Sequence, residues 1–384
     1  MEKIFTEDDL IYIQNRGNSI EKIQQQLDFF IQGIPKINLV RSAKVGDGIW
    51  QFSEEDTTVF VNYFDKHKVN YSIEKFVPAS GAATRMFKFL NEFLNDFDVE
   101  NDTINSYINK RNAKDISIFI FGLKNFPFYR ELKEKTIQLY PNYYSLSSDA
   151  KYHALIKTLL SKEGLDFANK PKGILPFHVR DEKIITPIEE NIFESDFFKK
   201  ENQKTKIHFT ITEEFQPDFE KITNQFSDYE ISFSYQNQST DTLAVHEDNT
   251  PFRIEGNKLF FRPGGHGALI DNLNALQSDI IYIKNIDNVS QNHRRVIETN
   301  KKILGGVLFF VQYKIFNYLK LLSSGNVTET QITEIKDFAE NKTSFPLPEE
   351  LNVFQTEYKI EYLIKVLNRP IRVCGMVKNE GEPG

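Results

Sequence analysis

The sequence predicts an α/β protein with a central sheet that is mixed but mostly parallel and is flanked by helices. Short apolar runs at residues 75–78, 206–212 and 230–235 have the length of strands. Segments whose apolar residues recur at helical spacing separate these runs, and strands that alternate with helices usually form a parallel sheet. We therefore expect a layered α/β core, with N-terminal helices before it and a helical insertion inside it.

The predicted domains follow from the same patterns. Residues 1–70 are expected to be helical, because Thr6 and Ser53 each precede acidic residues that suit the first turn of a helix. Residues 71–377 form the main domain, with the helical insertion at about 95–168 and a long helix at 291–322. A polar link then leads to a closing strand at 371–377. Residues 378–384 are expected to be a truncated or disordered tail, because a domain should not stop directly after a strand.

Composition and charge exclude several classes of protein. A net charge of −7 and a pI near 5.7 argue against DNA or RNA as the main partner. The first ten residues contain no apolar signal segment, and the most apolar stretch, residues 303–311, is too short to cross a bilayer. We expect a cytoplasmic protein without a membrane partner. The single cysteine, Cys374, lies in an apolar run and is expected to be a buried structural thiol.

The stretch after the strand at 75–78 is the first candidate site. It consists of small residues followed by a hydroxyl and a guanidinium group, and it leads directly into a helix: Ala79, Ser80, Gly81, Ala82, Ala83, Thr84 and Arg85. Free backbone N–H groups and the positive end of a helix dipole attract anions such as phosphate. An ordinary turn that is kept small for packing would have the same composition. The residues alone leave both interpretations open.

Three later segments carry further candidate residues. Lys172 lies in an extended loop between two prolines, where a lone lysine is usually a surface residue. The loop Gly264, Gly265, His266, Gly267 precedes a helix, and its glycines allow a ligand to approach the backbone. His266 could stack on or hydrogen-bond a nucleotide base, or it could have a structural role. Asp287 ends the expected buried strand at 279–288, where a carboxylate suits Mg²⁺ or caps the next helix.

Taken together, residues 79–86 and 171–176 resemble the two-part signature of sugar-nucleotide pyrophosphorylases. Residues 187–189 fit the Pro-Leu-Ile-Glu helix of that family, residues 263–267 resemble its uridine-nucleotide loop, and residues 286–288 resemble its Val-Asp-Asn metal strand. The chain as a whole is similar to domain-of-unknown-function family 4301, assigned to the nucleotide-diphospho-sugar transferase superfamily. The resemblance covers about residues 70–377 and implies a GT-A-like, Rossmann-type fold.

The resemblance implies transfer of a uridylyl-type group from a nucleoside triphosphate, with UTP as first candidate, to a sugar 1-phosphate. Pyrophosphate is released. It implies that Arg85 and Lys172 are catalytic, that Asp287 binds Mg²⁺, and that residues 79–84 and 264–267 bind the nucleotide. Ala83 stands where the family has a glycine, so a Cβ lies where backbone should approach phosphate.

Two other functions compete with this one. A glycosyltransferase on the same fold would usually have two acidic residues one position apart at a strand end, whereas only Asp287 is found here. A non-catalytic sensor of nucleotide sugars would tolerate Ala83. The sequence assigns neither the base, the sugar nor the oligomeric state.

Overall fold

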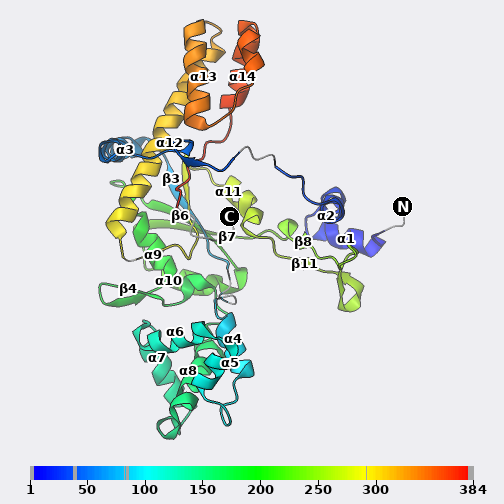
Figure 1. Ribbon diagram of the computed structural model, residues 1–384, viewed down its shortest axis with the longest axis vertical. Helices are drawn as coiled ribbons and strands as arrows, with labels where there is room; N and C mark the ends of the chain where they lie inside the picture. Colours follow the sequence, from blue (N-terminus) through cyan, green and yellow to red (C-terminus); the bar gives the residue numbers. More distant parts are fainter. Residues whose placement is uncertain (1–3, 38–40, 82, 84–85, 291, 379–384) are drawn as a thin grey trace. The chain divides into compact units, whose positions relative to one another are not determined.

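The computed structural model describes residues 4–37, 41–81, 83, 86–290 and 292–378 (Figure 1). The chain folds into two compact units, one of Met1–Lys36 with Ser72–Asn292 and one of Ile37–Tyr71 with His293–Gly384. These units have other boundaries than the expected division into 1–70 and 71–377. The difference arises because helix α3 (Glu54–His67) packs on the C-terminal helix α12 (Arg294–Ser323).

The first unit is built on a four-stranded sheet in the order β12-β3-β6-β7. All three pairings in this sheet are parallel. The strands are β3 (Ile73–Pro78), β6 (Thr205–Ile211), β7 (Tyr229–Tyr235) and β12 (Ile280–Ile283). The α/β class is therefore confirmed. The expectation of a mixed sheet is wrong for the described residues, because the antiparallel strand pairs lie outside this sheet.

One face of the sheet carries an apolar core. Val77, Ile207 and Phe209 are fully buried and belong to one cluster with Ile188 and Phe219. The last two residues come from helices α9 (Pro187–Glu194) and α10 (Gln216–Thr223), which cover this face. Every second residue of β3 and β6 points to these helices. This packing determines which face of the sheet each residue of β3 and β6 points to.

Strand β12 differs from the expectation of a buried strand over residues 279–288. It has four residues, pairs only with β3, and leaves Ile283 57% exposed, so it is an edge strand. Two backbone hydrogen bonds continue beyond it, from the N–H of Lys284 to the oxygen of Phe76 at 3.1 Å and from Ile286 to Pro78 at 3.4 Å. Asp287 thus follows directly after the last residue that is bonded to β3.

The helical insertion is present as expected, although its core extends further at both ends. Its helices are α4 (Lys88–Asp96), α5 (Ile104–Arg111), α6 (Lys114–Gly122), α7 (Tyr129–Leu139) and α8 (Ser148–Leu160). They gather into one bundle (Figure 1) around a core that runs from Ala83 to Leu175. Aromatic side chains such as Phe93 and Phe128 fill this core.

The N-terminal helices of the first unit pack on short strands. Helices α1 (Glu7–Asn15) and α2 (Ile20–Gln32) share a small core with β8 (Thr242–Leu243), β10 (Lys258–Leu259) and β11 (Phe261–Arg262). The expected hairpin turn at residues 255–257 is confirmed, because β9 (Arg253–Ile254) pairs antiparallel with β10. A further hairpin joins β4 (His178–Arg180) to β5 (Lys183–Ile185), and α11 (Ile270–Asn274) precedes β12.

The second unit contains β1 (Lys44–Val45), β2 (Gly48–Ile49), α3, α12, α13 (Glu329–Thr343) and α14 (Thr356–Leu367). The long helix expected at 291–322 is confirmed as α12. The polar link and the closing strand are wrong. The helix α14 occupies the link, burying Leu363, Val366 and Leu367, and residues 371–377 form no strand.

The reason for the missing strand lies in the packing of its apolar residues. Ile371 and Val373 contact the core of the second unit, while the alternate residues Arg372 and Cys374 are exposed. Alternation of this kind arises here from one-sided packing on helices and not from pairing with a sheet. The prediction of a buried Cys374 is therefore wrong: it is an exposed free thiol. No described helix is long and apolar enough to cross a membrane.

Candidate active site at the carboxyl edge of the sheet

The strand order singles out one point on the sheet. Strand β3 comes first in the sequence, the next two strands β6 and β7 lie on one side of it, and β12 lies on the other. The direction of the strand order therefore reverses between β3 and β12. In open parallel α/β sheets, ligands bind outside the carboxyl ends of the strands at such a switch point.

Two of the sequence-predicted residues meet there. The Nζ of Lys172 lies 2.7 Å from Oδ2 of Asp287. The side chains are 23% and 45% exposed, so the pair is open to solvent. Oδ1 of Asp287 has no hydrogen-bond partner in the described part of the chain. A cation and a carboxylate that are both accessible are thus held side by side, 115 residues apart in the sequence.

Lys172 is positioned by its own backbone and by a glycine. Its N–H donates to the oxygen of Gly81 at 3.2 Å, which joins the two parts of the sequence signature. A Cβ at Gly173 would lie 3.2 Å from Ile188 and 3.4 Å from Ile286. Glycine therefore lets this loop lie closely against α9 and against the segment that carries Asp287.

The loop after β3 is anchored at its start and accessible at Gly81. The N–H of Ala79 donates to the oxygen of Thr210 at 2.8 Å, and the side chain of Ala79 is buried. Ser80 is half-buried and Gly81 is exposed. A Cβ at Gly81 would meet no atom within 4 Å, and its φ is not in the left-handed region. Neither packing against the described residues nor backbone conformation explains this glycine.

Ala83 does not lie as the resemblance implied. Its side chain is fully buried in the core of the helical insertion. Its N–H donates to the oxygen of Lys170 at 3.4 Å. The methyl group is therefore used for packing, and the N–H is already paired. Ala82, Thr84 and Arg85 lie outside the described residues, so their roles stay predictions.

The glycine loop lies further along the same edge. A Cβ at Gly264 would come within 2.9 Å of Ala268 Cβ, so this glycine serves packing, whereas Gly265 and Gly267 have open space around them. His266 is exposed. The following helix is held at the end of β7, because Asn272 Nδ2 donates to Ser234 Oγ and to the oxygen of Tyr235, both at 2.8 Å.

The glycine loop and the ion pair thus both lie at the carboxyl ends of the strands, but the loop lies at β7 and the ion pair at β3 and β12, on opposite sides of the sheet's strand order. Strands β12 and β7 are separated by three strand spacings, or about 14 Å. No hydrogen bond or ion pair between described residues joins the glycine loop to Lys172 or Asp287. The structure therefore brings Lys172 and Asp287 together, whereas the glycine loop lies at the same edge of the sheet but apart from them.

A polar network that was not predicted from the sequence lies on the second face of the sheet. His208 is buried and lies 2.7 Å from Ser232 Oγ through Nδ1 and 2.7 Å from Ser234 Oγ through Nε2. Burial lowers the pKa of His208, which favours the neutral ring. Asn272 connects this network to the glycine-loop helix. The signal was present in the sequence, because polar residues alternate with apolar ones along β7.

A second missed group is a buried lysine in β3. Lys75 is 1% exposed, and its Nζ donates to Asn191 O at 2.8 Å and to Glu194 Oε2 at 2.7 Å. Lys284 also pairs with Glu194. Burial lowers the pKa of Lys75 to about 8, against the opposing effect of Glu194. The network links β3 to α9 and to the segment that precedes Asp287.

The described residues contain no group of three His, Cys, Asp or Glu side chains that could hold a metal ion. Mg²⁺ at a phosphate site needs only one or two carboxylates, since phosphate oxygens and water complete its shell. The accessible carboxylate of Asp287, with its Oδ1 unpaired among the described residues, fits such a role.

The comparisons with known proteins identify the family. The model described as "Domain of unknown function (DUF4301)" matches residues 6–384. Because the match spans nearly the whole chain, the chain belongs to this family, as the sequence analysis expected. No curated protein and no solved structure matches significantly.

Proposed function

We propose that this protein is a sugar-1-phosphate nucleotidyltransferase, which transfers a uridylyl-type group from a nucleoside triphosphate and releases pyrophosphate. The single observation that carries the proposal is the Lys172–Asp287 pair, at the switch point of a parallel sheet and next to the open backbone at Gly81. A nucleoside triphosphate requires a cation that binds phosphate and a carboxylate that binds Mg²⁺, and Lys172 and Asp287 could supply these. The glycine loop at the same edge of the sheet could approach the nucleotide closely. A GT-A-like fold is part of this proposal.

The chemistry asks for positioning and charge neutralisation. An oxygen of the sugar 1-phosphate attacks the α-phosphorus in line, and the bond to the pyrophosphate oxygen breaks. No general base is required, because the attacking phosphate is already ionised. Lys172 would hold the attacking phosphate and the α-phosphate, and Arg85 would hold the leaving pyrophosphate. Asp287 would hold Mg²⁺, which neutralises charge on the triphosphate.

In the ligand-free chain, Lys172 and Asp287 neutralise each other. Binding of a triphosphate with its cation would replace this pair by two others, Lys172 with phosphate and Asp287 with Mg²⁺. Lys172 and Asp287 would therefore each have a partner of opposite charge both in the ligand-free chain and in the chain with triphosphate and Mg²⁺ bound. This exchange predicts that nucleotide affinity depends on Mg²⁺, because Asp287 would otherwise compete with phosphate for the lysine.

A non-catalytic sensor of nucleotide sugars is the second candidate. The observation that favours it is the hydrogen bond from the Ala83 N–H to Lys170, since this N–H is not free for phosphate. The two functions share the binding site and differ only in turnover. A glycosyltransferase is less favoured, because Asp287 is the one acidic residue at the segment that follows β12.

Calorimetry with UTP and Mg²⁺, followed by a pyrophosphate-release assay over a panel of sugar phosphates, tests the proposal. We expect binding and release. Binding without release would support the sensor, and no binding of any nucleotide would exclude both functions.

Variants test the assigned residues. Lys172→Ala and Arg85→Ala should abolish turnover, and Asp287→Ala should remove the Mg²⁺ dependence of binding. The free energy of unfolding should change by less than about 1 kcal/mol in Lys172→Ala, because the ion pair is solvent-exposed. Lys221→Ala and Asp218→Ala, two exposed positions on α10, are the matched controls and should stay active. Full activity of Lys172→Ala would refute its role.

A further inference from the structure

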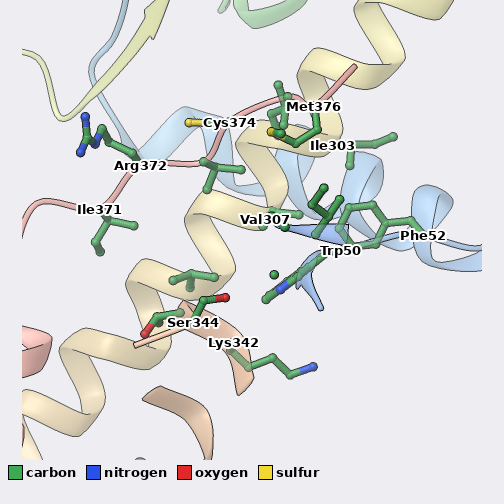
Figure 2. Close-up of a pocket in the computed structure, with 18 of the residues that line it drawn as sticks. Trp50, Phe52, Ile303, Val307, Lys342, Ser344, Ile371, Arg372, Cys374 and Met376 are labelled. Atoms are coloured by element: carbon green, nitrogen blue, oxygen red, sulfur yellow. The ribbon is translucent and has the colours of Figure 1, made fainter. Parts of the chain in front are cut away.

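The second compact unit contains a pocket that shares no residue with the candidate active site. Its volume is about 1030 Å³, at the upper end of the range for small-molecule sites. Helix α12 forms its base through Ile303 and Val307, and Trp50 and Phe52 lie on one side (Figure 2). The part of the extended C-terminal segment that carries Ile371, Arg372 and Cys374 lies on the other side.

The lining is apolar and basic. Among the described residues that line the pocket there are three cations, Lys342, Arg369 and Arg372, and no aspartate or glutamate. None of the three forms an ion pair with a carboxylate of the described chain. Figure 2 shows Lys342 and Arg372 on opposite sides of the pocket.

The contacts of these cations leave their charge available. The Nζ of Lys342 lies 5.2 Å from the centre of the Trp50 ring, and Arg369 lies 4.5 Å from the centre of the Phe345 ring. Cations over aromatic rings remain able to attract an anion, because the ring carries no net charge. An apolar pocket with unneutralised cations is complementary to a ligand that has a large apolar part and an anionic group.

We propose that this pocket binds an amphipathic organic anion. An alkyl chain or ring system would lie along α12 against Val307 and Trp50, and a carboxylate or phosphate group would contact Lys342, Arg369 or Arg372. The site lies in the second compact unit, whereas Lys172 and Asp287 belong to the first. Binding at this pocket therefore does not depend on the proposed nucleotidyl transfer.

The chain contains two natural reporters for this pocket. Trp50 is its only tryptophan and Cys374 its only cysteine, and both line the pocket. Trp50 is partly buried, and the thiol of Cys374 is exposed. Tryptophan emission and the rate at which a neutral maleimide modifies the thiol therefore report on occupancy at two separate points of the lining, without any added label.

The experiment titrates the full chain with four probes that each carry a ten-carbon chain, at concentrations below their micelle formation or solubility limit. Decanoate and decyl phosphate are the anions, decanol is neutral, and decyltrimethylammonium is cationic. We expect both anions to shift Trp50 emission to shorter wavelength and to slow modification of Cys374, with saturation at the same concentration for both signals. Whichever of decanoate and decyl phosphate binds more tightly shows whether the pocket prefers a carboxylate or a phosphate ligand. Equal binding of the neutral or the cationic probe, or no binding of either anion, would overturn the proposal.

A charge-matched pair of variants provides the second arm. The triple variant Lys342→Gln, Arg369→Gln, Arg372→Gln should weaken binding of the anions on the order of tenfold and leave any binding of decanol unchanged. The control removes three exposed cations of the same unit that do not line the pocket: Lys66→Gln, Arg295→Gln, Lys320→Gln. It should bind the anions as the wild type does. Unchanged binding by the first variant, or an equal loss in the control, would overturn the proposal.

Discussion

Replacing Gly306 by alanine should destabilise the second compact unit, even though alanine is the better helix former. Gly306 lies in α12 where this helix crosses α3. A Cβ at this position would lie 2.2 Å from the backbone oxygen of Phe60 and 2.9 Å from its carbonyl carbon. Backbone atoms cannot turn away as a side chain can, so the two helices would have to separate by about 1 Å to restore normal contact distances.

The magnitude follows from two opposing effects. Overpacking of this kind costs up to about 3 kcal/mol. Replacing glycine by alanine inside a helix returns about 1 kcal/mol. The separation would also loosen the stacking of Phe64 on Phe309, whose ring centres lie 5.4 Å apart. We expect the free energy of unfolding to fall by about 2 kcal/mol.

Urea unfolding followed by Trp50 emission measures this change, because the only tryptophan of the chain belongs to the second unit. Gly122→Ala is the control: this glycine lies in α6, and a Cβ there would meet no atom within 4 Å. The control should leave the unfolding transition that Trp50 reports unchanged. It should stabilise α6 by up to about 1 kcal/mol, which circular dichroism would measure. If Gly306→Ala unfolds at the same urea concentration as the wild type or at a higher one, the close crossing of α3 and α12 is refuted.

Three further predictions concern the first unit. The pKa of Lys75 is about 8 in the folded chain and near 10.5 in the unfolded chain, so the contribution of Lys75 to stability rises from pH 8 to 10.5. The difference in free energy of unfolding between the wild type and Lys75→Met, measured by urea unfolding, should therefore change by up to about 3 kcal/mol in favour of the wild type over that range. A difference that stays constant with pH would contradict the lowered pKa. The Arg253 guanidinium, which donates to both carboxylate oxygens of Asp9 at 2.9 and 2.8 Å, lowers the pKa of Asp9. Asp9→Asn should therefore cost about 1–3 kcal/mol at pH 7, and acid titration should show this cost disappearing as the pH falls through the folded pKa. Ala83→Gly should destabilise the chain by about 1–2 kcal/mol and leave UTP affinity unchanged in calorimetry, because the methyl group is buried in the insertion core. A gain in affinity would show that the methyl group hinders nucleotide binding at the loop after β3.

Several elements could be predicted from the sequence because their causes lie within a few residues. Helix α3 begins after Ser53, whose side chain and that of Asp56 bond each other's backbone N–H groups. Thr186 and Glu189 do the same at α9, which also has a proline in its first turn. These capping boxes are local hydrogen bonds, so the residue types and their spacing are sufficient.

The position of the candidate site was predictable only in part. The small-residue loop and Lys172 were recognisable as motifs, but their pairing depends on the hydrogen bond from Lys172 N–H to Gly81. The Cβ of Ala83 was expected to lie where phosphate approaches the loop, but it is buried in the core of the helical insertion, which the local sequence does not reveal. The buried ion pair of Lys75 was missed, since a lysine in a short strand gives no sign of its partner Glu194.

The sequence by itself determined the α/β class, the helix starts and the helical insertion, because periodicity and capping act over neighbouring residues. Only the tertiary structure decided the strand order, the edge position of β12 and the contact of Lys172 with Asp287 across 115 residues. It also decided that residues 371–377 lie along helices with Cys374 exposed, and not in a sheet. The physical reason is that an alternating apolar pattern specifies which side of a segment is buried, whereas the partner that buries it is set by packing over the whole unit.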